Sequence, residues 1–170
     1  MTKPNRGHLK QCRIGGIHLT QANTTGSVAV HGTCRIIEIP RFTDLRGTLS
    51  AIEGKPLLPV DPKRFFYIYG VPEGAQRGCH ALRTGEELII AMAGSFKIRV
   101  DDGDSAKEFQ LDRPDQGLYV PPLMWHVLHS FTPGAVCAVL ASARYDNDGY
   151  LRVYEDFLEA VRRSRGQSAE

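Results

Sequence analysis

The feature of this sequence that most limits its fold is a series of short β-like runs separated by turn-forming residues. The runs are rich in β-branched and aromatic residues, and Gly, Pro and Asp fill the intervals between them. Short strands that recur about every ten residues, with such turns between them, are typical of an all-β sandwich or barrel. The predicted strands are Cys34–Ile39, Thr48–Ile52, Arg64–Tyr69, Glu87–Met92, Ser95–Val100, Glu108–Leu111, Leu118–Val120, His126–Phe131 and Val136–Ser142.

The C-terminal part of the chain has a helical pattern instead. Asp148 is a suitable N-cap for a helix that starts after it. Arginines in the last turn of such a helix complement its dipole. The predicted apolar face consists of Leu151, Tyr154, Phe157, Leu158 and Val161, and the basic end of Arg162, Arg163 and Arg165. We expect this helix to lie across the barrel.

Length and pattern predict one domain. The chain has 170 residues, which fits a single hydrophobic core. Residues 1–33 show little periodicity and are predicted to be an N-terminal extension, and residues 34–165 form the predicted domain. No internal repeat is visible.

Composition excludes several classes of protein. The net charge is only +2, which predicts no nucleic-acid partner. No apolar run approaches the roughly 18 residues that span a membrane, and the N-terminus lacks the apolar stretch of a signal peptide. We therefore expect a cytoplasmic protein without a membrane partner.

The four cysteines, Cys12, Cys34, Cys79 and Cys137, show no metal-binding or disulfide spacing. They are predicted to be reduced and mostly buried. Cys79 precedes His80, and alternation along a strand should direct it to the opposite face.

Two segments carry recognisable chemistry. The segment from Gly74 to Gly94, which includes His80 and Glu87, resembles the first cupin motif, and the segment from Pro121 to His126 resembles the second. The resemblance implies an all-β, cupin-type (double-stranded β-helix or jelly-roll) barrel, here with a C-terminal α-helix. Alternation places His80 and Leu82 on one face of their strand.

A more specific resemblance extends from about Cys34 to Phe157. The chain is similar to the TDP-4-keto-6-deoxyglucose 3,4-ketoisomerases, the WxcM-like cupin sugar-nucleotide isomerases. This resemblance implies a homodimer that shares strands between subunits, a TDP-linked 4-keto-6-deoxy sugar as substrate, and no metal or other cofactor. The matching stretches are Asp44-x-Arg46-Gly47-x-Leu49, Lys63-Arg64-Phe65-Phe66-Tyr67-Ile68-Tyr69, Arg77-Gly78-x-His80-Ala81, Asp101-Asp102-Gly103, Gly117-Leu118, Trp125-His126, Ala141-Ser142-x-x-Tyr145-Asp146 and Tyr150-x-Arg152-x-Tyr154-x-x-Phe157.

One position departs from the family pattern. The family reads Arg-Gly-x-His-Ala-His-Lys, with both histidines implicated in catalysis, whereas this chain has Leu82 at the second histidine and Arg83 at the lysine. The departure leaves open whether the chain is an isomerase with a changed proton relay or a relative with another role.

The chemistry of a keto shift suggests roles for three residues. His80 is the candidate base that removes the C3 proton, because histidine titrates near neutral pH. Tyr67 is a candidate proton donor or enediolate stabiliser; strand alternation does not separate it from Tyr69, and the resemblance favours Tyr67. His126 is the candidate replacement for the missing histidine, with water or a single swinging His80 as alternatives.

Five further residues are candidates for substrate binding. Arg46 and Arg77 each stand beside glycine, where a planar guanidinium suits a diphosphate. Arg83 keeps the positive charge of the family's lysine. Trp125 and Tyr145 can pack against the base or the sugar, although packing in the core is the stronger interpretation for each.

Three alternatives remain open at this point. His80, Glu87 and His126 could hold a metal in a metal-dependent cupin. The chain could be a 3,5-epimerase of the dTDP-4-dehydrorhamnose type. It could also be a catalytically impaired sugar-nucleotide-binding relative. The nucleotide base and the configuration of the product at C4 are not predicted.

Overall fold

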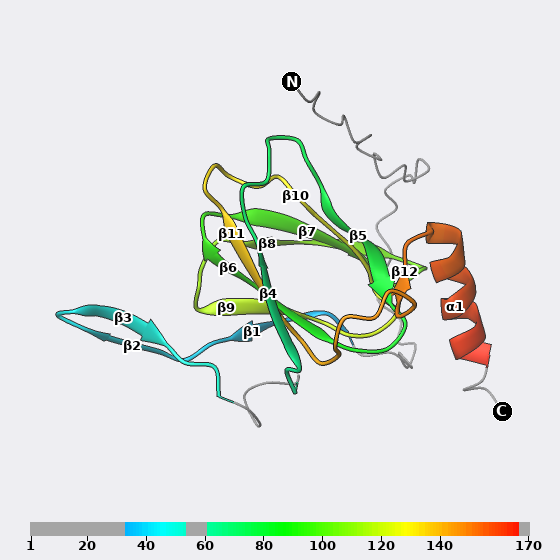
Figure 1. The fold of residues 1–170 in the computed structure, drawn as a ribbon, viewed down its shortest axis with the longest axis horizontal. Helices are drawn as coiled ribbons and strands as arrows, with labels where there is room; N and C mark the ends of the chain where they lie inside the picture. The colour runs from blue at the N-terminus through cyan, green and yellow to red at the C-terminus, as the bar shows by residue number, and fades with distance from the viewer. Residues whose placement is uncertain (1–32, 54–60, 167–170) are drawn as a thin grey trace, which may run out of the picture.

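The computed structural model describes residues 33–53 and 61–166, and these residues form two facing antiparallel sheets with one helix outside them (Figure 1). The predicted all-β jelly-roll fold with a C-terminal helix is confirmed. The predicted extension, except Thr33, lies outside the described residues, as does Cys12.

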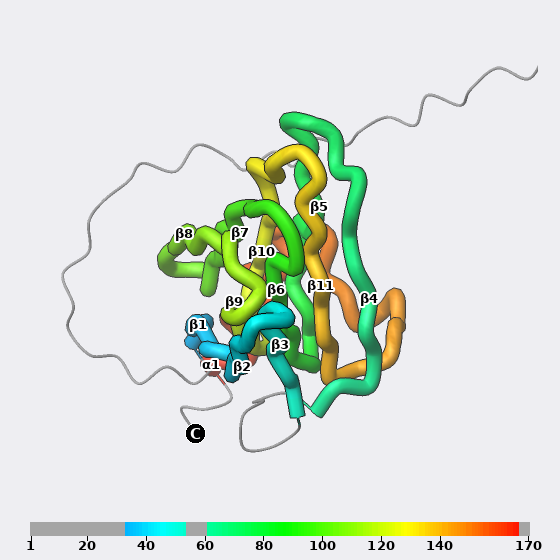
Figure 2. Tube along the Cα trace, turned by 90° about the vertical axis from the view of Figure 1, so that its left-hand side faces the viewer, coloured from blue at the N-terminus to red at the C-terminus, as the bar shows by residue number. Residues whose placement is uncertain are grey.

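Except for β7 (Phe96–Asp101) and β8 (Ala106–Leu111), neighbouring strands in the two sheets are not consecutive in sequence. The first sheet has the order β1 (Arg35–Glu38), β9 (Gln116–Val120), β6 (Glu87–Ala93), β11 (Val136–Ala141), β4 (Arg64–Ile68). The second has the order β12 (Tyr150–Leu151), β5 (Arg77–Leu82), β10 (Trp125–His129), β7, β8. The tube view shows β6 and β11 running past β10 and β5 of the other sheet (Figure 2).

The space between the sheets is apolar over most of its length. Alternate residues of β7 face inward, so that Phe96, Ile98 and Val100 are buried. Phe96 stacks on Phe131 at a ring-centroid distance of 4.9 Å. Each fully buried side chain of this size contributes roughly 1.5–3 kcal/mol, and together they make this part of the barrel a packed core.

Helix α1 (Tyr154–Gly166) covers the outer face of the second sheet. Phe157 and Val161 are buried against Trp125 and Val127 of β10. The prediction that Asp148 caps the helix is wrong. The helix begins at Tyr154 because the preceding segment, Tyr150–Leu151, is a strand that pairs with β5.

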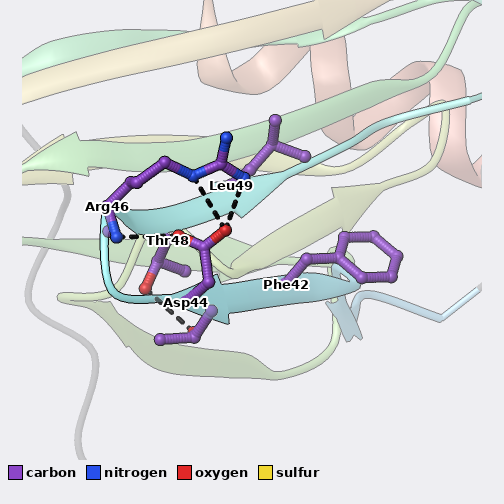
Figure 3. A pocket seen from close by; sticks show the side chains of 7 residues that line it. Phe42, Asp44, Arg46, Thr48 and Leu49 are labelled. Atoms are coloured by element: carbon purple, nitrogen blue, oxygen red, sulfur yellow. Dashed lines mark hydrogen bonds and ion pairs between the residues drawn. The ribbon is translucent and has the colours of Figure 1, made fainter.

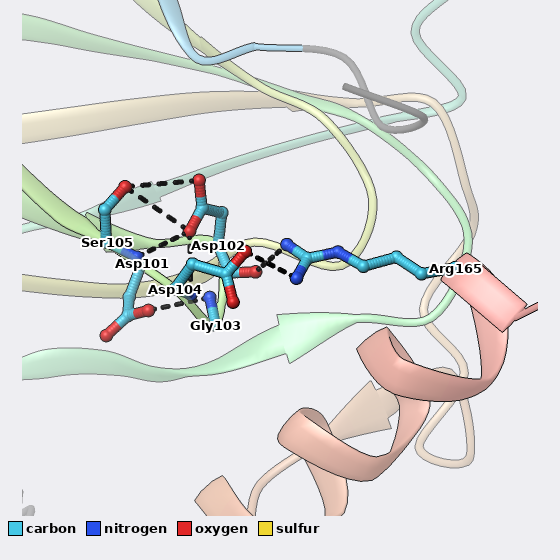
Figure 4. A network of polar contacts seen from close by, with 6 residues as sticks. All are labelled: Asp101, Asp102, Gly103, Asp104, Ser105 and Arg165. Atoms are coloured by element: carbon cyan, nitrogen blue, oxygen red, sulfur yellow. Dashed lines mark hydrogen bonds and ion pairs between the residues drawn. The ribbon is translucent and has the colours of Figure 1, made fainter. Parts of the chain in front are cut away.

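The end of the helix is attached to the turn between β7 and β8 (Figure 4). Arg165 donates a hydrogen bond to the Asp104 carboxylate at 2.6 Å and another to the Asp102 carbonyl oxygen at 3.1 Å. The hydroxyl of Tyr154, in the first turn, donates to Asp101 at 2.9 Å. Asp102 and Gly103 lie in the turn of the hairpin formed by β7 and β8, and these contacts hold the helix at both ends.

A second hairpin projects from the barrel (Figure 1). It consists of β2 (Arg41–Asp44) and β3 (Gly47–Ser50), and all of its residues are exposed. Phe42 and Leu49 are 64% and 61% exposed, so the apolar side chains of this hairpin are not covered by the rest of the chain. At its tip Arg46 folds back over Asp44, with Nε 3.0 Å from the carboxylate (Figure 3).

The described part of the chain contains no helix that is long and apolar enough to cross a membrane. The three cysteines of this part form no disulfide: Cys34 and Cys137 are buried, and Cys79 is partly buried against the helix. Burial raises the pKa of Cys34 and of Cys137 to about 12. The predicted outward direction of Cys79 is confirmed, because its packing partners lie on the outer face of the sheet.

Candidate functional site

Two histidines on neighbouring strands form the centre of the candidate site. His80 of β5 lies directly opposite His126 of β10, and their ring centroids are 4.6 Å apart. Paired residues in an antiparallel ladder share a face. Both rings lie near Glu87, which belongs to the facing sheet, so this face is the one that lines the space between the sheets.

A β-bulge aims His80 at that space. The pairing of β10 with β5 shifts between His126 and Val127, and both Gly78 and Cys79 have positive φ, 77° and 56°. The bulge absorbs one residue, so Arg77 returns to the face that carries His80. At position 78 a Cβ atom would lie 2.8 Å from the His126 carbonyl oxygen. Only glycine fits there.

Two charged residues of the first sheet complete a polar cluster within the barrel. Glu87 lies 3.4 Å from Nε2 of His126 and 3.9 Å from the guanidinium of Arg64. The Glu87 and His126 side chains are each only 3% exposed, and that of Arg64 is 19% exposed. Nδ1 of His126 lies 3.2 Å from the Met124 carbonyl oxygen, so both of its nitrogens face protein groups.

Two tyrosines extend the cluster toward solvent. The ring of Tyr150 stands edge-on to His80 at 4.8 Å, and its hydroxyl oxygen accepts a hydrogen bond from Arg64 at 2.8 Å. Tyr145 packs on Tyr150 at 5.6 Å, and Arg152 lies over the Tyr150 ring at 4.5 Å. Arg64 thereby connects the edge strands β4 and β12 of the two sheets.

Burial controls the charge state of the central groups. Desolvation, followed by repulsion from His126, lowers the pKa of His80 to about 4, and desolvation lowers that of His126 to about 4. Desolvation raises the pKa of Glu87. His80 is therefore neutral at pH 7 and able to accept a proton, and Glu87 favours the charged imidazole by its attraction.

The two ring nitrogens of His80 have no hydrogen-bond partner, although both are buried. Leaving a buried polar group unpaired costs about 1–3 kcal/mol. Such groups in a folded protein call for an explanation, and a binding or catalytic role is a common one. His80 is thus available to a ligand.

The same residues could hold a metal ion. One donor atom from each of His80, Glu87 and His126 lies within 4.8 Å of the others. Two imidazoles and a carboxylate suit a divalent transition metal, so this cluster fits the metal-dependent alternative as well as a proton-transfer site.

The structure brings together some of the predicted site residues. His80, His126 and Tyr145 belong to one cluster. Arg77 is exposed and lies opposite Leu128 in the ladder, on the face of the second sheet that carries His80. Leu82, as expected, is buried on that face.

The other four predicted site residues lie outside the cluster around His80. Tyr67 is 58% exposed on β4, where it stacks with Tyr69 and not with His80. Trp125 is buried under helix α1, 5.8 Å from Phe157, because its position in β10 faces away from His126.

Arg46 lies at the tip of the projecting hairpin, away from β12 and β5 (Figure 1). Arg83 is exposed beside the helix and donates to the Asp148 carbonyl oxygen at 3.2 Å. Within one chain, neither arginine is part of the cluster around His80.

Sequence reasoning missed Arg64 and Tyr150 as site residues. A signal for Arg64 was present, because it alternates with Phe66 and Ile68, which pack against the core. An arginine on the inward face of a strand needs a polar partner. Tyr150 belongs to the family-like stretch Tyr150-x-Arg152-x-Tyr154-x-x-Phe157, but it falls in the first turn of the predicted helix, and no role was predicted for it.

Comparison with known proteins decides the family. The family model described as "FdtA: WxcM-like, C-terminal" matches residues 26–162. The chain belongs to this family. A TDP-4-oxo-6-deoxy-α-D-glucose-3,4-oxoisomerase from Aneurinibacillus thermoaerophilus is 37% identical over 127 residues, which are 75% of this chain and 91% of that protein.

Solved structures of 3,4-ketoisomerases are similar to this chain as well. A His-to-Asn variant of QdtA from Thermoanaerobacterium thermosaccharolyticum, in complex with TDP-4-keto-6-deoxyglucose, is 35% identical, with a TM-score of 0.74 over 76% of this chain and 94% of that one. A 3,4-ketoisomerase from Helicobacter canadensis is 36% identical, also with a TM-score of 0.74, over 76% and 97% of the two chains.

The 3,5-epimerases share only the fold. The dTDP-4-dehydrorhamnose 3,5-epimerase of Bacillus anthracis has a TM-score of 0.62 and 20% identity, over 69% of this chain and 76% of that chain. This likeness supports a common barrel and carries no argument for epimerase activity.

Proposed function

We propose that this WxcM-like protein is a sugar-nucleotide 3,4-ketoisomerase that moves the ketone of a TDP-linked 4-keto-6-deoxyhexose from C4 to C3. The observation that carries the proposal is the imidazole of His80, buried between the sheets with neither ring nitrogen in a hydrogen bond. Family membership supplies the substrate class, since a relative is known in complex with TDP-4-keto-6-deoxyglucose.

The geometry supports His80 as the base. The carbonyl at C4 acidifies the C3 proton, and a neutral imidazole accepts it to give an enediolate. Because Glu87 attracts the protonated ring, the charge that forms on His80 is stabilised within the cluster. The same ring then returns the proton to C4, which completes the proton transfer between the two carbon atoms.

Substrate binding is proposed to use the exposed side of the cluster. Tyr145 is 63% exposed beside Tyr150 and offers a flat surface to the base or the sugar. Arg77, on the face of β5 that carries His80, offers a guanidinium fork to the diphosphate. Arg83 and Trp125 are not required by this arrangement.

We further propose that the chain acts as a homodimer in the cytoplasm. The projecting hairpin exposes Phe42, Leu45 and Leu49, a grouping that favours contact with a second copy. Such packing would carry Arg46 away from its own barrel and toward the partner. The cysteines of the described residues form no disulfide, which fits a reducing compartment.

The test is an assay of the purified protein with TDP-4-keto-6-deoxyglucose in deuterated water. We expect a 3-keto product, measured by NMR, with deuterium at C4 to the extent that the proton on His80 exchanges with solvent before it is returned. We also expect a loss of at least about 10²-fold in rate for His80→Asn. Exchange at C3 and C5 with the ketone still at C4 would indicate an epimerase. TDP binding without any exchange would indicate a binding protein and refute the proposal.

The metal-dependent alternative is retained because three donor groups meet in the cluster. Protein purified without chelator should contain less than about 0.1 metal ion per chain if His80 acts alone as a base. Stoichiometric zinc, iron or manganese, together with loss of activity on chelation, would favour the alternative.

A further inference from the structure

A keto shift moves two protons, and His80 accounts for only one of them. One proton leaves C3 and one arrives at C4, while another leaves the oxygen on C3 and arrives at the oxygen on C4. The oxygen atoms need a group that both donates and accepts. His126 does not fit, because its nitrogens face Met124 and Glu87.

Tyr150 has the position that this second role requires. It lies opposite Leu82 in the β12–β5 ladder, so it shares the inward face with Leu82 and His80. Its ring contacts that of His80 edge-on at 4.8 Å, which places its phenol beside the base.

The hydrogen bond from Arg64 leaves the phenol proton available. The guanidinium of Arg64 donates to the phenol oxygen at 2.8 Å, and arginine has no acceptor atom. The phenol proton must therefore be donated elsewhere. Once it is lost, the same arginine lies next to the negative phenolate, and its charge is permanent.

We propose that Tyr150 is the catalytic residue that moves the hydroxyl protons of the substrate, with Arg64 positioning its phenol; this inference rests on the ketoisomerase activity proposed above. His80 takes the proton from C3 as Tyr150 gives its phenol proton to the C4 oxygen, and an enediol forms. The phenolate then takes the proton of the C3 hydroxyl as His80 returns its proton to C4. The C4 ketone becomes a hydroxyl and the C3 hydroxyl a ketone, and both residues regain their starting forms without a co-reactant.

The assignment also explains how a chain with Leu82 can carry out the reaction. One imidazole serves both carbon atoms and one phenol serves both oxygen atoms, so a second imidazole is not needed. Arg64 does not hold the phenol of Tyr145 as it holds that of Tyr150, because it meets the face of the Tyr145 ring, with the guanidinium carbon 5.6 Å from the ring centroid.

The test is Tyr150→Phe, which keeps the ring against His80 and removes only the hydroxyl. We expect kcat to fall at least 10²-fold, with the dissociation constant for TDP within about twofold of the wild-type value. The ratio of deuterium incorporation at C3 to ketone transfer should rise, because His80 still removes the C3 proton but the oxygen atoms exchange slowly. Tyr154→Phe, which loses a phenol bonded to Asp101 outside the site, is the matched control and should keep its kcat.

The outcomes separate this inference from the proposed function. Wild-type protein that does not isomerise the substrate would refute the function itself. Active wild-type protein with a Tyr150→Phe variant of unchanged kcat, or with an unchanged ratio of exchange to transfer, would overturn the role of Tyr150 alone. If Tyr150→Phe loses TDP binding, Arg64→Lys decides: a fall in kcat of at least tenfold with TDP still bound supports the assignment, and an unchanged kcat overturns it.

Discussion

Leu82 occupies the inward position next to His80 along β5, where an imidazole would also face the substrate. The site nevertheless contains a neutral base, a phenol and two arginines within contact distance of one another. At the scale of single residues, the chemistry depends on which protons each group can reach rather than on the number of histidines.

Replacing Leu82 by histidine tests that view. Because His80 and Tyr150 divide the proton transfers, we expect Leu82→His to change kcat by less than about tenfold. The variant should also lose about 1–2 kcal/mol of unfolding free energy, because a polar imidazole replaces a buried aliphatic side chain. Steady-state kinetics and urea unfolding measure the two effects; a rise in kcat above about 10²-fold would show that Leu82 limits catalysis.

The close approach at Gly78 gives a second prediction. Gly78→Ala meets both the left-handed backbone and a clash with the His126 carbonyl oxygen at 2.8 Å. Gly134 has a nearly identical φ of 76° and open space around it, so Gly134→Ala isolates the backbone cost of about 1 kcal/mol. We expect Gly78→Ala to cost at least about 2 kcal/mol more in urea unfolding, and to lower kcat because the histidine pair shifts. Equal losses for the two variants would contradict the clash.

The buried histidines predict an acid-sensitive fold. The pKa values of His80 and His126 are lowered from 6.5 to about 4, so the unfolded chain binds more protons between these pH values. Stability from these groups is complete above about pH 6.5 and falls as the pH drops toward 4, by at most about 3 kcal/mol per histidine. The raised pKa of Glu87 acts in the opposite direction. Urea unfolding of wild type and His80→Asn from pH 7 to 4.5 should give a smaller slope for the variant; parallel slopes would contradict the shift for His80.

At the scale of elements, sequence patterns predicted most strands because their apolar alternation is local. The patterns missed the start of the helix, since Tyr150–Leu151 satisfies its backbone by pairing with β5, a contact distant in sequence. They also did not decide which face of a strand is inside. Trp125 and Tyr67 alternate correctly, yet each lies on the outer face of its sheet. The bulge at Gly78 was equally invisible, because it depends on the register with β10.

Helix α1 supports the strands that carry the histidines. Phe157 is fully buried against Trp125, so Phe157→Ala should cost about 3–5 kcal/mol. Val153, which is 51% exposed just before the helix, provides the control, and Val153→Ala should cost less than about 0.5 kcal/mol. Thermal and urea unfolding measure both. A loss below about 1 kcal/mol for Phe157→Ala would mean that the helix adds little to the barrel.

At the scale of the whole molecule, the barrel divides into an apolar part and a polar end. The packed core fixes the two sheets, and the link between Arg64 and Tyr150 joins their edges beside His80. The hairpin of β2 and β3 is exposed over its whole length, and Arg41 ties it to the barrel through an ion pair with Asp115.

That hairpin predicts the oligomeric state. Phe42 and Leu49 are expected to pack on a second copy, so the double variant Phe42→Asp and Leu49→Asp should be a monomer at micromolar concentration where the wild type is a dimer. Val153→Asp, an exposed charge on the far side of the second sheet, should remain dimeric. Sedimentation velocity distinguishes the species, and a dimeric double variant would remove the hairpin from the interface.

The projecting hairpin also has a kinetic consequence. If Arg46 of one subunit binds the diphosphate of the substrate held by the other subunit, each active site is complete only in the dimer. Turnover per chain would then fall when the protein is diluted and recover when it is concentrated. An excess of a variant with a defective hairpin would lower the activity of the wild type by forming heterodimers with it.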